Sequence, residues 1–416
     1  MIKKQLKTLA DIDIEGKVVL YRAPYDIDVV DGKLEDTKRI DFTIPTLKFL
    51  IEKNCKIVIL TYVGRPDGKV VERLKTDPHA KYLSKVLNIN VKKVDDCVGQ
   101  IAEDAVFQMK SGQVLMLENV RFYNQEVKDD DEFAKELCKG KDIVVFDAFP
   151  QAHRKHASTT GILRHLNAVA GLYFEKEYTQ ITNIISNTTR PFVAVIGGAK
   201  VSDKVLAIKN LAHLADLVLV GGGVANAFLY QQGFNISKSF VENVFVDEAV
   251  NKKQDIKSLV SDILRDKTSN SFVIANKICG IENSNIILPV DFVVEINGNA
   301  KVIDIEILKN EKDFEIKDIG PKTITMYTNI LTKANTVFWN GPVGVFEQKD
   351  FSLGSVGILN FIKNFKGLGL VAGGDTIEII DKFDEISNFN NISLAGGATL
   401  DMISGKQLAV MPFLTR

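Results

Sequence analysis

The sequence has few cysteines, no long apolar run and almost no net charge. Its four cysteines lie far apart without a CxxC pair, which argues against a disulfide framework or a zinc site and favours reduced, buried thiols. No stretch reaches the roughly 18 apolar residues of a membrane span, and residues 1–17 lack the apolar core of a signal peptide. With 52 basic and 53 acidic residues, nothing indicates a nucleic-acid partner. We therefore expect a cytoplasmic protein with neither nucleic acid nor membrane as a partner.

Two common phosphate-binding motifs are also missing. No GxGxxG stands where a dinucleotide-binding fold requires it, which disfavours an NAD dehydrogenase, and GGAKVSDK (197–204) lacks the spacing of a P-loop. The chain instead runs four apolar segments into glycine clusters, at residues 191–200, 216–226, 368–376 and 391–399. Each is typical of a strand-to-helix turn at one edge of a parallel sheet, where backbone N–H groups bind polyphosphates. The second half is therefore predicted to bind a nucleotide.

The first half alternates apolar runs with amphipathic segments. Continuous apolar runs at 17–21, 56–60, 113–117 and 142–149 predict parallel strands buried on both faces. Residues 44–54 and 130–140 predict helices between them. Residues 174–189 predict a helix that connects two α/β units, and the charged region 241–284 predicts a helix plus a surface excursion.

Arginines follow several of these strands. Arg65, Arg121 and Arg154 each lie a few residues beyond a predicted strand, where a parallel sheet presents its carboxyl edge. Arg22 and Arg39 stand near other strand ends or turns. Guanidinium groups that converge there could clamp an anionic substrate through forked hydrogen bonds.

The order of motifs resembles the phosphoglycerate kinase family over nearly the whole chain. The segments that carry this resemblance include DGKLEDTKRI (31–40), VGRPDG (63–68), LENVRF (117–122), DAFPQAHRKHAST (147–159), GGAKVSDK (197–204), GGGVANAFL (221–229), WNGPVGVFE (339–347) and GGDT (373–376). The resemblance implies an α/β fold with two Rossmann-like parallel-sheet domains facing across a hinged cleft. It places phosphoglycerate on residues 1–173, with 404–416 returning to that domain, an inter-domain helix at 174–189, and the nucleotide on residues 190–403.

The resemblance also implies the reaction and its participants. A monomer would transfer a phosphoryl group reversibly between 1,3-bisphosphoglycerate with ADP and 3-phosphoglycerate with ATP, in glycolysis or gluconeogenesis, with Mg²⁺ bound to the nucleotide. The residues that match family catalytic positions are Arg39, Lys200 and Lys204. Those that match acceptor-binding positions are Asp26, Tyr62, Arg65, Arg121 and Arg154. Those that match nucleotide-binding positions are Lys204, Gly223, Asn340, Pro342, Glu347, Gly373, Gly374, Asp375 and Thr376, and Asp375 would also hold the metal.

The departures from the family pattern gather on the acceptor side. Pro24 stands where the family has the aspartate that binds the substrate hydroxyl, Asp26 replaces an asparagine, and Tyr62 replaces a histidine. Asp26 could accept the hydroxyl bond, and the Tyr62 hydroxyl could donate to a carboxylate. Three interpretations stay open: a phosphoglycerate kinase with a divergent acceptor pocket, a related kinase for another small phosphorylated acid, and a nucleotide-binding homologue without transfer activity. The preference between adenine and guanine nucleotides is also open.

Overall fold

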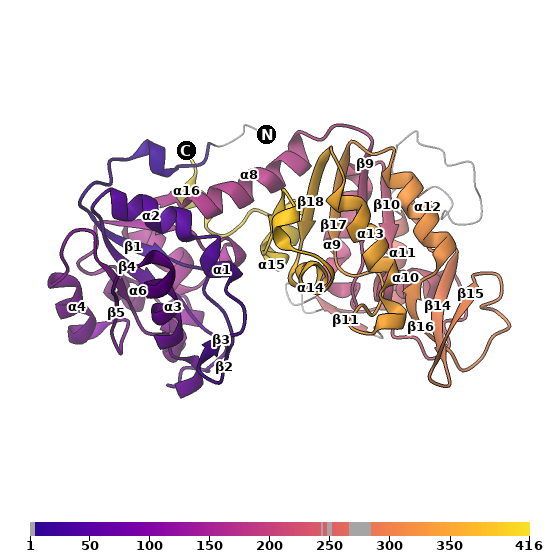
Figure 1. The fold of residues 1–416 in the computed structure, drawn as a ribbon, viewed down its shortest axis with the longest axis horizontal. Coiled ribbons are helices and arrows are strands. Elements are labelled where there is room, and N and C mark those ends of the chain that lie inside the picture. Colours follow the sequence, from indigo (N-terminus) through magenta and orange to yellow (C-terminus); the bar gives the residue numbers. More distant parts are fainter. Residues whose placement is uncertain (1–4, 243, 248–251, 266–283) are drawn as a thin grey trace. The chain divides into compact units, whose positions relative to one another are not determined.

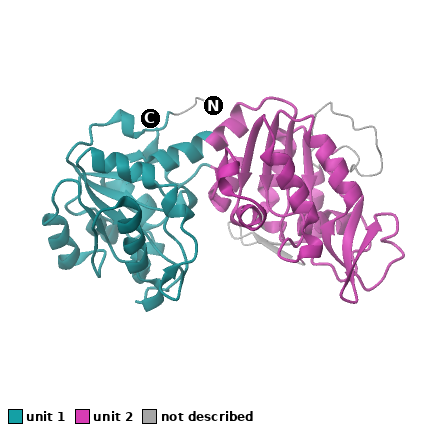
Figure 2. Ribbon diagram, in the orientation of Figure 1, with its two compact units in different colours: residues 1–179, 407–416 teal, residues 180–406 magenta. Residues whose placement is uncertain are grey.

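The chain forms two compact units in a computed structural model that describes residues 5–242, 244–247, 252–265 and 284–416. Unit 1 comprises Met1–Thr179 and Gln407–Arg416, and unit 2 comprises Gln180–Lys406 (Figure 2). The boundary falls inside helix α8 (Leu172–Ser186), in the region where the sequence predicts a connecting helix. The last residues pack on unit 1, where the backbone N–H of Lys7 donates to the carbonyl of Leu414 at 2.8 Å.

Unit 1 is built on a six-stranded, fully parallel sheet with strand order β5-β6-β4-β1-β7-β8 (Figure 1). Its strands are β1 (Val18–Arg22), β4 (Lys56–Leu60), β5 (Val91–Lys93), β6 (Val114–Met116), β7 (Ile143–Phe146) and β8 (Ala168–Ala170). Its helices are α1 (Lys38–Asp41), α2 (Ile44–Glu52), α3 (Asp77–Leu87), α4 (Gly99–Phe107), α5 (Asn124–Val127), α6 (Asp131–Cys138), α7 (Ile162–His165) and the C-terminal α16 (Met411–Leu414). A short antiparallel hairpin pairs β2 (Val29–Val30) with β3 (Lys33–Leu34). The four strands predicted from apolar runs and both predicted helices are confirmed.

Unit 2 contains a second six-stranded parallel sheet, with strand order β13-β10-β9-β17-β18-β19. Its strands are β9 (Phe192–Ile196), β10 (Leu217–Val220), β13 (Ile286–Ile287), β17 (Thr336–Asn340), β18 (Leu368–Ala372) and β19 (Ile392–Ser393). Its helices are α9 (Val205–Leu214), α10 (Gly222–Gln231), α11 (Ile256–Arg265), α12 (Pro321–Leu331), α13 (Leu353–Lys363), α14 (Gly374–Phe383) and α15 (Gly396–Ile403). All four apolar segments that lead into glycine clusters are strands of this one sheet, as predicted.

Besides the β2–β3 hairpin of unit 1, two antiparallel elements of unit 2 were not predicted. Strands β15 (Asn299–Asp304), β14 (Asp291–Ile296) and β16 (Glu315–Ile319) form a separate sheet in that order, and β11 (Val244–Asp247) pairs with β12 (Lys252–Asp255). The region 241–284 therefore contains the expected helix, α11, preceded by a hairpin, while residues 266–283 lie outside the described part of the chain.

The cysteine prediction is confirmed where the structure describes it. Cys55, Cys97 and Cys138 are buried free thiols, and Cys279 lies outside the described residues. Burial is the main cause that raises the pKa of the Cys55 thiol to about 11 and that of Cys138 to about 12. No described helix has the length and apolar character that crossing a membrane requires.

Candidate functional site

The glycine turns of unit 2 meet because parallel strands end at the same edge of the sheet. A Cβ atom on Gly197 would lie 2.0 Å from the carbonyl oxygen of Pro342, and one on Gly223 would lie 2.0 Å from that of Ala199. Side chains at these positions would collide with backbone, so glycine is required for the turns after β9, β10 and β17 to touch. The result is a surface made largely of peptide groups.

Two helices begin at this edge of the sheet. Helix α10 starts at Gly222 and α14 at Gly374, which follows Gly373 in a left-handed conformation with φ of 99°. The first four N–H groups of a helix have no intrahelical acceptor, but in α10 those of Gly222 and Val224 already donate to the carbonyls of Val343 and Gly198 at 2.9 and 3.2 Å. The helix dipole favours an anion at both starts, and that of α14 is the more accessible one. Gly374 is exposed, and a Cβ atom there would meet nothing within 4 Å.

Polar side chains link the turn after β17 to the turn between β18 and α14. The hydroxyl of Thr376 accepts a hydrogen bond from the Gly341 N–H at 2.7 Å and donates to the Ala372 carbonyl at 2.8 Å. The Asn340 amide nitrogen donates to the same carbonyl at 2.8 Å, whereas its buried Oδ1 accepts no hydrogen bond. Asn340 and Thr376, both expected at the nucleotide site, are therefore brought together with Gly373.

The two expected lysines take different positions. The Lys204 ammonium donates to the carbonyl of Gly197, so its charge lies directly over the first glycine turn. Lys200 is exposed in the loop that follows the same strand, β9. A compact ammonium beside the glycine turns is suited to hold a phosphate that moves during reaction.

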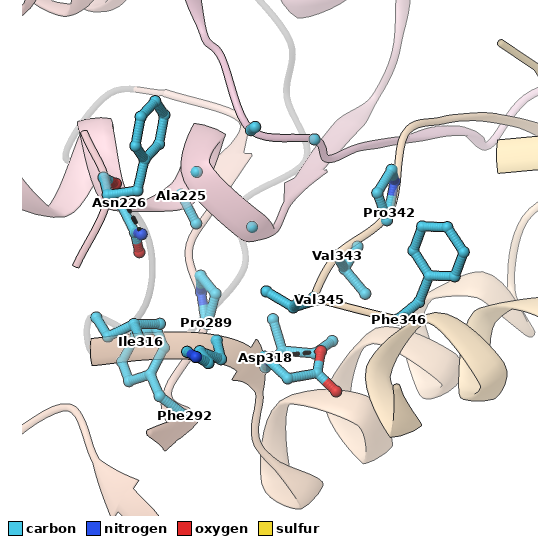
Figure 3. A pocket seen from close by; sticks show the side chains of 18 of the residues that line it. Ala225, Asn226, Pro289, Phe292, Ile316, Asp318, Pro342, Val343, Val345 and Phe346 are labelled. Carbon is cyan, nitrogen blue, oxygen red and sulfur yellow. Dashed lines mark hydrogen bonds between the residues drawn. The ribbon is translucent and has the colours of Figure 1, made fainter. Parts of the chain in front are cut away.

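A pocket of about 320 Å³ opens beside these turns (Figure 3). Four of the residues expected at the nucleotide site line it, namely Gly223, Pro342, Glu347 and Asp375. The other wall is largely apolar and comes from Phe240, Pro289, Phe292, Ile316, Val343, Val345 and Phe346. An apolar slot next to helix N-termini matches a planar base joined to phosphates.

The donor atoms around Asp375 fit a magnesium ion that is shared with a nucleotide. It lies in the first turn of α14 and lines the pocket. Within the described ranges, no group of three or more His, Cys, Asp or Glu side chains could hold a metal ion alone. Mg²⁺ commonly binds through one or two carboxylates together with substrate phosphates, so this donor set fits a metal that arrives with the nucleotide.

Unit 1 holds a basic pocket of about 460 Å³ at the carboxyl edge of its sheet. Arg65, Arg121 and Arg154, all predicted as acceptor-binding residues, line it together with His156. Arg65 follows β4, Arg121 lies in the turn after β6, and Arg154 follows β7. Three guanidinium groups in one pocket create a site for an anion with several oxygen atoms.

Arg39 does not line this pocket but is linked to it through hydrogen bonds. Its Nη1 donates to the backbone carbonyl of Asp26, whose Oδ1 accepts from the Gly64 N–H at 2.8 Å. The Gly64 carbonyl in turn accepts from Arg121 Nη1 at 2.7 Å. One carboxylate oxygen of Asp26 is therefore already engaged.

The three unusual acceptor-side residues are also explained by local contacts. Pro24 accepts a backbone hydrogen bond from the Asp26 N–H at 2.9 Å, which forms a tight turn after β1. Tyr62 is only 1% exposed, and its hydroxyl accepts a hydrogen bond from Arg154 Nη1 at 3.0 Å. Tyr62 is not among the residues that line the basic pocket.

Comparison with known proteins decides the family. A family model described as phosphoglycerate kinase matches residues 9–406 of this chain. The chain belongs to the phosphoglycerate kinase family. The phosphoglycerate kinase of Pelotomaculum thermopropionicum is 38% identical over 406 residues, covering 97% of each chain, and that of Dictyoglomus turgidum is 38% identical over 411 residues, covering 98% of each.

Solved structures of the family have the same fold. Phosphoglycerate kinase from Coxiella burnetii superposes with a TM-score of 0.81 at 32% identity, over 99% of each chain. The enzyme from Pyrococcus horikoshii gives 0.80 at 32% identity, over 98% of each chain. The expected α/β fold with two parallel sheets is therefore confirmed.

One residue of the nucleotide pocket that the family resemblance did not point to is Asp318. Burial raises the pKa of its carboxyl to about 7, even though the N–H groups of Ile319 and Gly354 each donate to it at 2.8 Å. A Cβ on Gly344 would lie 2.0 Å from its Oδ1. Asp318 lies within β16 and thus anchors the loop that forms the pocket wall, and no sequence signal had singled it out.

Arg22, one of the arginines expected to converge on an anion, does not line the basic pocket but belongs to a buried polar group. Arg22 is fully buried, and its Nε donates to the carbonyl and hydroxyl oxygens of Ser158 at 3.0 and 3.1 Å. Glu126, also fully buried, accepts from the N–H and hydroxyl of Ser158, and its Oε1 lies 3.5 Å from Nδ1 of His156. Burial raises the pKa of Glu126, but His156 and Arg22 outweigh it and leave that pKa below its usual value. His156 therefore lines the basic pocket and also faces this buried carboxylate.

Proposed function

We propose that this chain transfers a phosphoryl group reversibly between 1,3-bisphosphoglycerate with ADP and 3-phosphoglycerate with ATP. Membership of the phosphoglycerate kinase family supports the reaction. The observation that carries the proposal is the combination, in one chain, of a glycine-built nucleotide pocket and a pocket with three arginines. Phosphoryl transfer is achieved largely by positioning and by charge stabilisation, and both pockets are built for those tasks.

At the nucleotide pocket, backbone groups and side chains have different roles. The N-termini of α10 and α14 hold the phosphates, and the Lys204 ammonium, assisted by Lys200, balances charge on the group in transit. Asp375 binds the nucleotide magnesium, which neutralises phosphate charge when present. Asn340 and Thr376 hold the Gly373–Gly374 turn, while Pro342 and Glu347 border the base and ribose.

On the acceptor side, guanidinium groups bind the substrate anion. Arg65, Arg121 and Arg154 clamp its phosphate, since they line the same pocket. The Arg39 guanidinium donates one hydrogen bond to the Asp26 carbonyl. Its other N–H groups stabilise the transferring phosphoryl group. No proton needs to be removed from an ionised carboxylate acceptor, so no general base is assigned.

A related kinase for another small phosphorylated acid is the second candidate. The observation that favours it is the loop containing Pro24 and Asp26, because Pro24 has no side-chain acceptor and one oxygen of Asp26 is bound to Gly64. A charged hydrogen bond contributes roughly 1.5–3 kcal/mol, so its loss would weaken hydroxyl recognition by about one to two orders of magnitude. Turnover of 3-phosphoglycerate at ordinary efficiency would exclude this candidate.

The proposed function is tested by coupled measurement of ADP formed from MgATP and 3-phosphoglycerate. We expect robust turnover that Arg39→Ala abolishes and that Arg73→Ala, an exposed arginine of unit 1 outside the pocket, leaves unchanged. Absence of turnover despite MgATP binding would reject the proposal and favour either another acceptor or a homologue without transfer activity.

We also propose, on family membership alone, that the enzyme acts as a cytoplasmic monomer. Size-exclusion chromatography with light scattering should give a mass near 46.1 kDa. A stable mass of twice that value would contradict the monomer.

A further inference from the structure

Tyr62 lies at the centre of the arginine cluster of unit 1. The guanidinium carbon of Arg121 is 3.5 Å from the centre of the Tyr62 ring, those of Arg22 and Arg154 are 5.4 and 5.8 Å away, and Arg154 Nη1 donates to the hydroxyl at 3.0 Å. One neutral aromatic side chain therefore contacts three cations.

The geometry gives Tyr62 two separate effects on these cations. Its ring face carries negative electrostatic potential, so it attracts the Arg121 guanidinium that stacks on it. Its hydroxyl oxygen fixes the Arg154 guanidinium by a charge-assisted bond. Both effects oppose the mutual repulsion of like charges and limit the rotamers of two long side chains.

The remaining contacts of Arg121 and Arg154 do not replace Tyr62. Within the described part of the chain, the Arg121 guanidinium donates one hydrogen bond, from Nη1 to the Gly64 carbonyl, and its buried Nε has no hydrogen-bond partner. Among the described residues, the bond to the Tyr62 hydroxyl is the only hydrogen bond that the Arg154 side chain makes. The Tyr62 side chain itself is buried behind the pocket and does not line it.

We propose that Tyr62 is a positioning residue that holds Arg121 and Arg154 for the anionic group of the acceptor, and that it acts through them. This inference rests on the proposed function and identifies how the acceptor pocket works without the family histidine at this position. It also replaces the expectation that the Tyr62 hydroxyl binds a substrate carboxylate directly.

The first test separates the hydroxyl from the ring. Tyr62→Phe removes only the bond to Arg154 and should raise KM for 3-phosphoglycerate about 10-fold, whereas Tyr62→Leu also removes the stacking surface and should raise it about 100-fold. KM for MgATP should stay unchanged in both variants. Tyr82→Phe is the matched control, because its hydroxyl donates to Asp41 at 2.8 Å away from the pocket. An unchanged acceptor KM in Tyr62→Phe would overturn the proposal.

A double-mutant cycle tests whether Tyr62 acts through Arg154. The Arg154→Lys variant keeps the charge but loses the planar fork that meets the hydroxyl. Added to Arg154→Lys, the Tyr62→Phe change should raise the acceptor KM less than about twofold. An equal rise in both backgrounds would mean that Tyr62 touches the acceptor itself, and the positioning role would be wrong.

A binding measurement separates failure of this inference from failure of the proposed function. Calorimetric titration with inorganic phosphate needs no turnover and reports the arginine pocket directly. Weaker phosphate binding in Tyr62→Phe, but not on top of Arg154→Lys, supports the positioning role even if 3-phosphoglycerate is not the acceptor. Equal phosphate affinity of wild type and Tyr62→Phe overturns the inference even if 3-phosphoglycerate is turned over.

Discussion

Replacement of Gly374 by alanine offers a direct test of where the nucleotide phosphates lie. Gly374 is exposed at the first position of α14, its φ is not positive, and a Cβ there would meet no atom within 4 Å. Gly→Ala at a compatible backbone position stabilises a protein by about 0.4–1 kcal/mol, so Gly374→Ala should unfold in urea no earlier than wild type. If phosphate oxygens approach this backbone, the methyl group will occupy their place.

The expected consequence is a loss of nucleotide affinity without a loss of stability. Displacing a phosphate from the helix N-terminus should weaken MgADP binding by at least about tenfold, or about 1.4 kcal/mol, as measured by calorimetry. Wild-type MgADP affinity in Gly374→Ala would refute the assignment of this turn to the phosphates.

Gly223→Ala provides the matched contrast. Its Cβ would lie 2.0 Å from the Ala199 carbonyl oxygen, where real contacts exceed 3.0 Å, so one of the two backbone segments must move. Overpacking of this kind costs about 1–3 kcal/mol, and we expect lower stability together with weaker binding. An unfolding midpoint equal to that of wild type would show that the two glycine turns are not packed as described.

Three further predictions concern separate parts of the molecule. Arg39→Ala should lower kcat more than MgATP affinity, whereas Asp375→Ala should mainly weaken magnesium-nucleotide binding; steady-state kinetics and calorimetry would contradict this division if both variants changed only binding. Burial lowers the pKa of His79 to about 4. As the pH falls from 6.5 to 4, His79 therefore becomes protonated in the unfolded chain before it does in the folded one. The free energy of unfolding should drop by about 3 kcal/mol over that range, and a His79→Gln variant with the same pH dependence would refute this. Glu126→Gln should destabilise the fold by about 3–5 kcal/mol, because it removes the buried charge that interacts with His156 and Arg22, and an unchanged melting temperature would argue against that interaction.

Four strands of each six-stranded sheet could be predicted, because these strands are largely buried on both faces, whereas β5, β8, β13 and β17 were not predicted. Such strands read as continuous apolar runs, and in unit 2 each run ends in glycines that a close turn requires. The antiparallel sheet was missed because its edge strand β15 is mostly exposed and its sequence is polar. The turn between β14 and β15 did carry a signal, since Asn297 and Gly298 have φ of 49° and 79° and Asn-Gly is typical of a two-residue hairpin.

The positions of the candidate site residues could be predicted from the sequence in both units, but their side-chain contacts could be predicted only in part. The positions of the glycine turns and of the strand-end arginines could be predicted, because parallel strands all end at the same edge of the sheet. The apolar wall of the nucleotide pocket was only partly predictable, since Phe240, Phe292 and Ile316 are distant in sequence and read as ordinary core residues. The contact between Tyr62 and three arginines depends on tertiary packing, and sequence alone suggested a different partner for its hydroxyl.

This difference explains why the unusual residues gather in unit 1. The glycine turns of the nucleotide site are made of backbone groups in close contact, and a side chain at Gly197 or Gly223 would collide with a carbonyl, so few sequences can build them. The acceptor site is made of side chains, and neighbouring residues hold these side chains in position. A substitution of one such neighbour can be compensated by a substitution of another. Tyr62 in place of a histidine is one such exchange, because an aromatic face and a hydroxyl can hold guanidinium groups without adding another positive charge. Divergence in the acceptor loop is therefore compatible with retained phosphoryl transfer, provided that the arginines keep their positions.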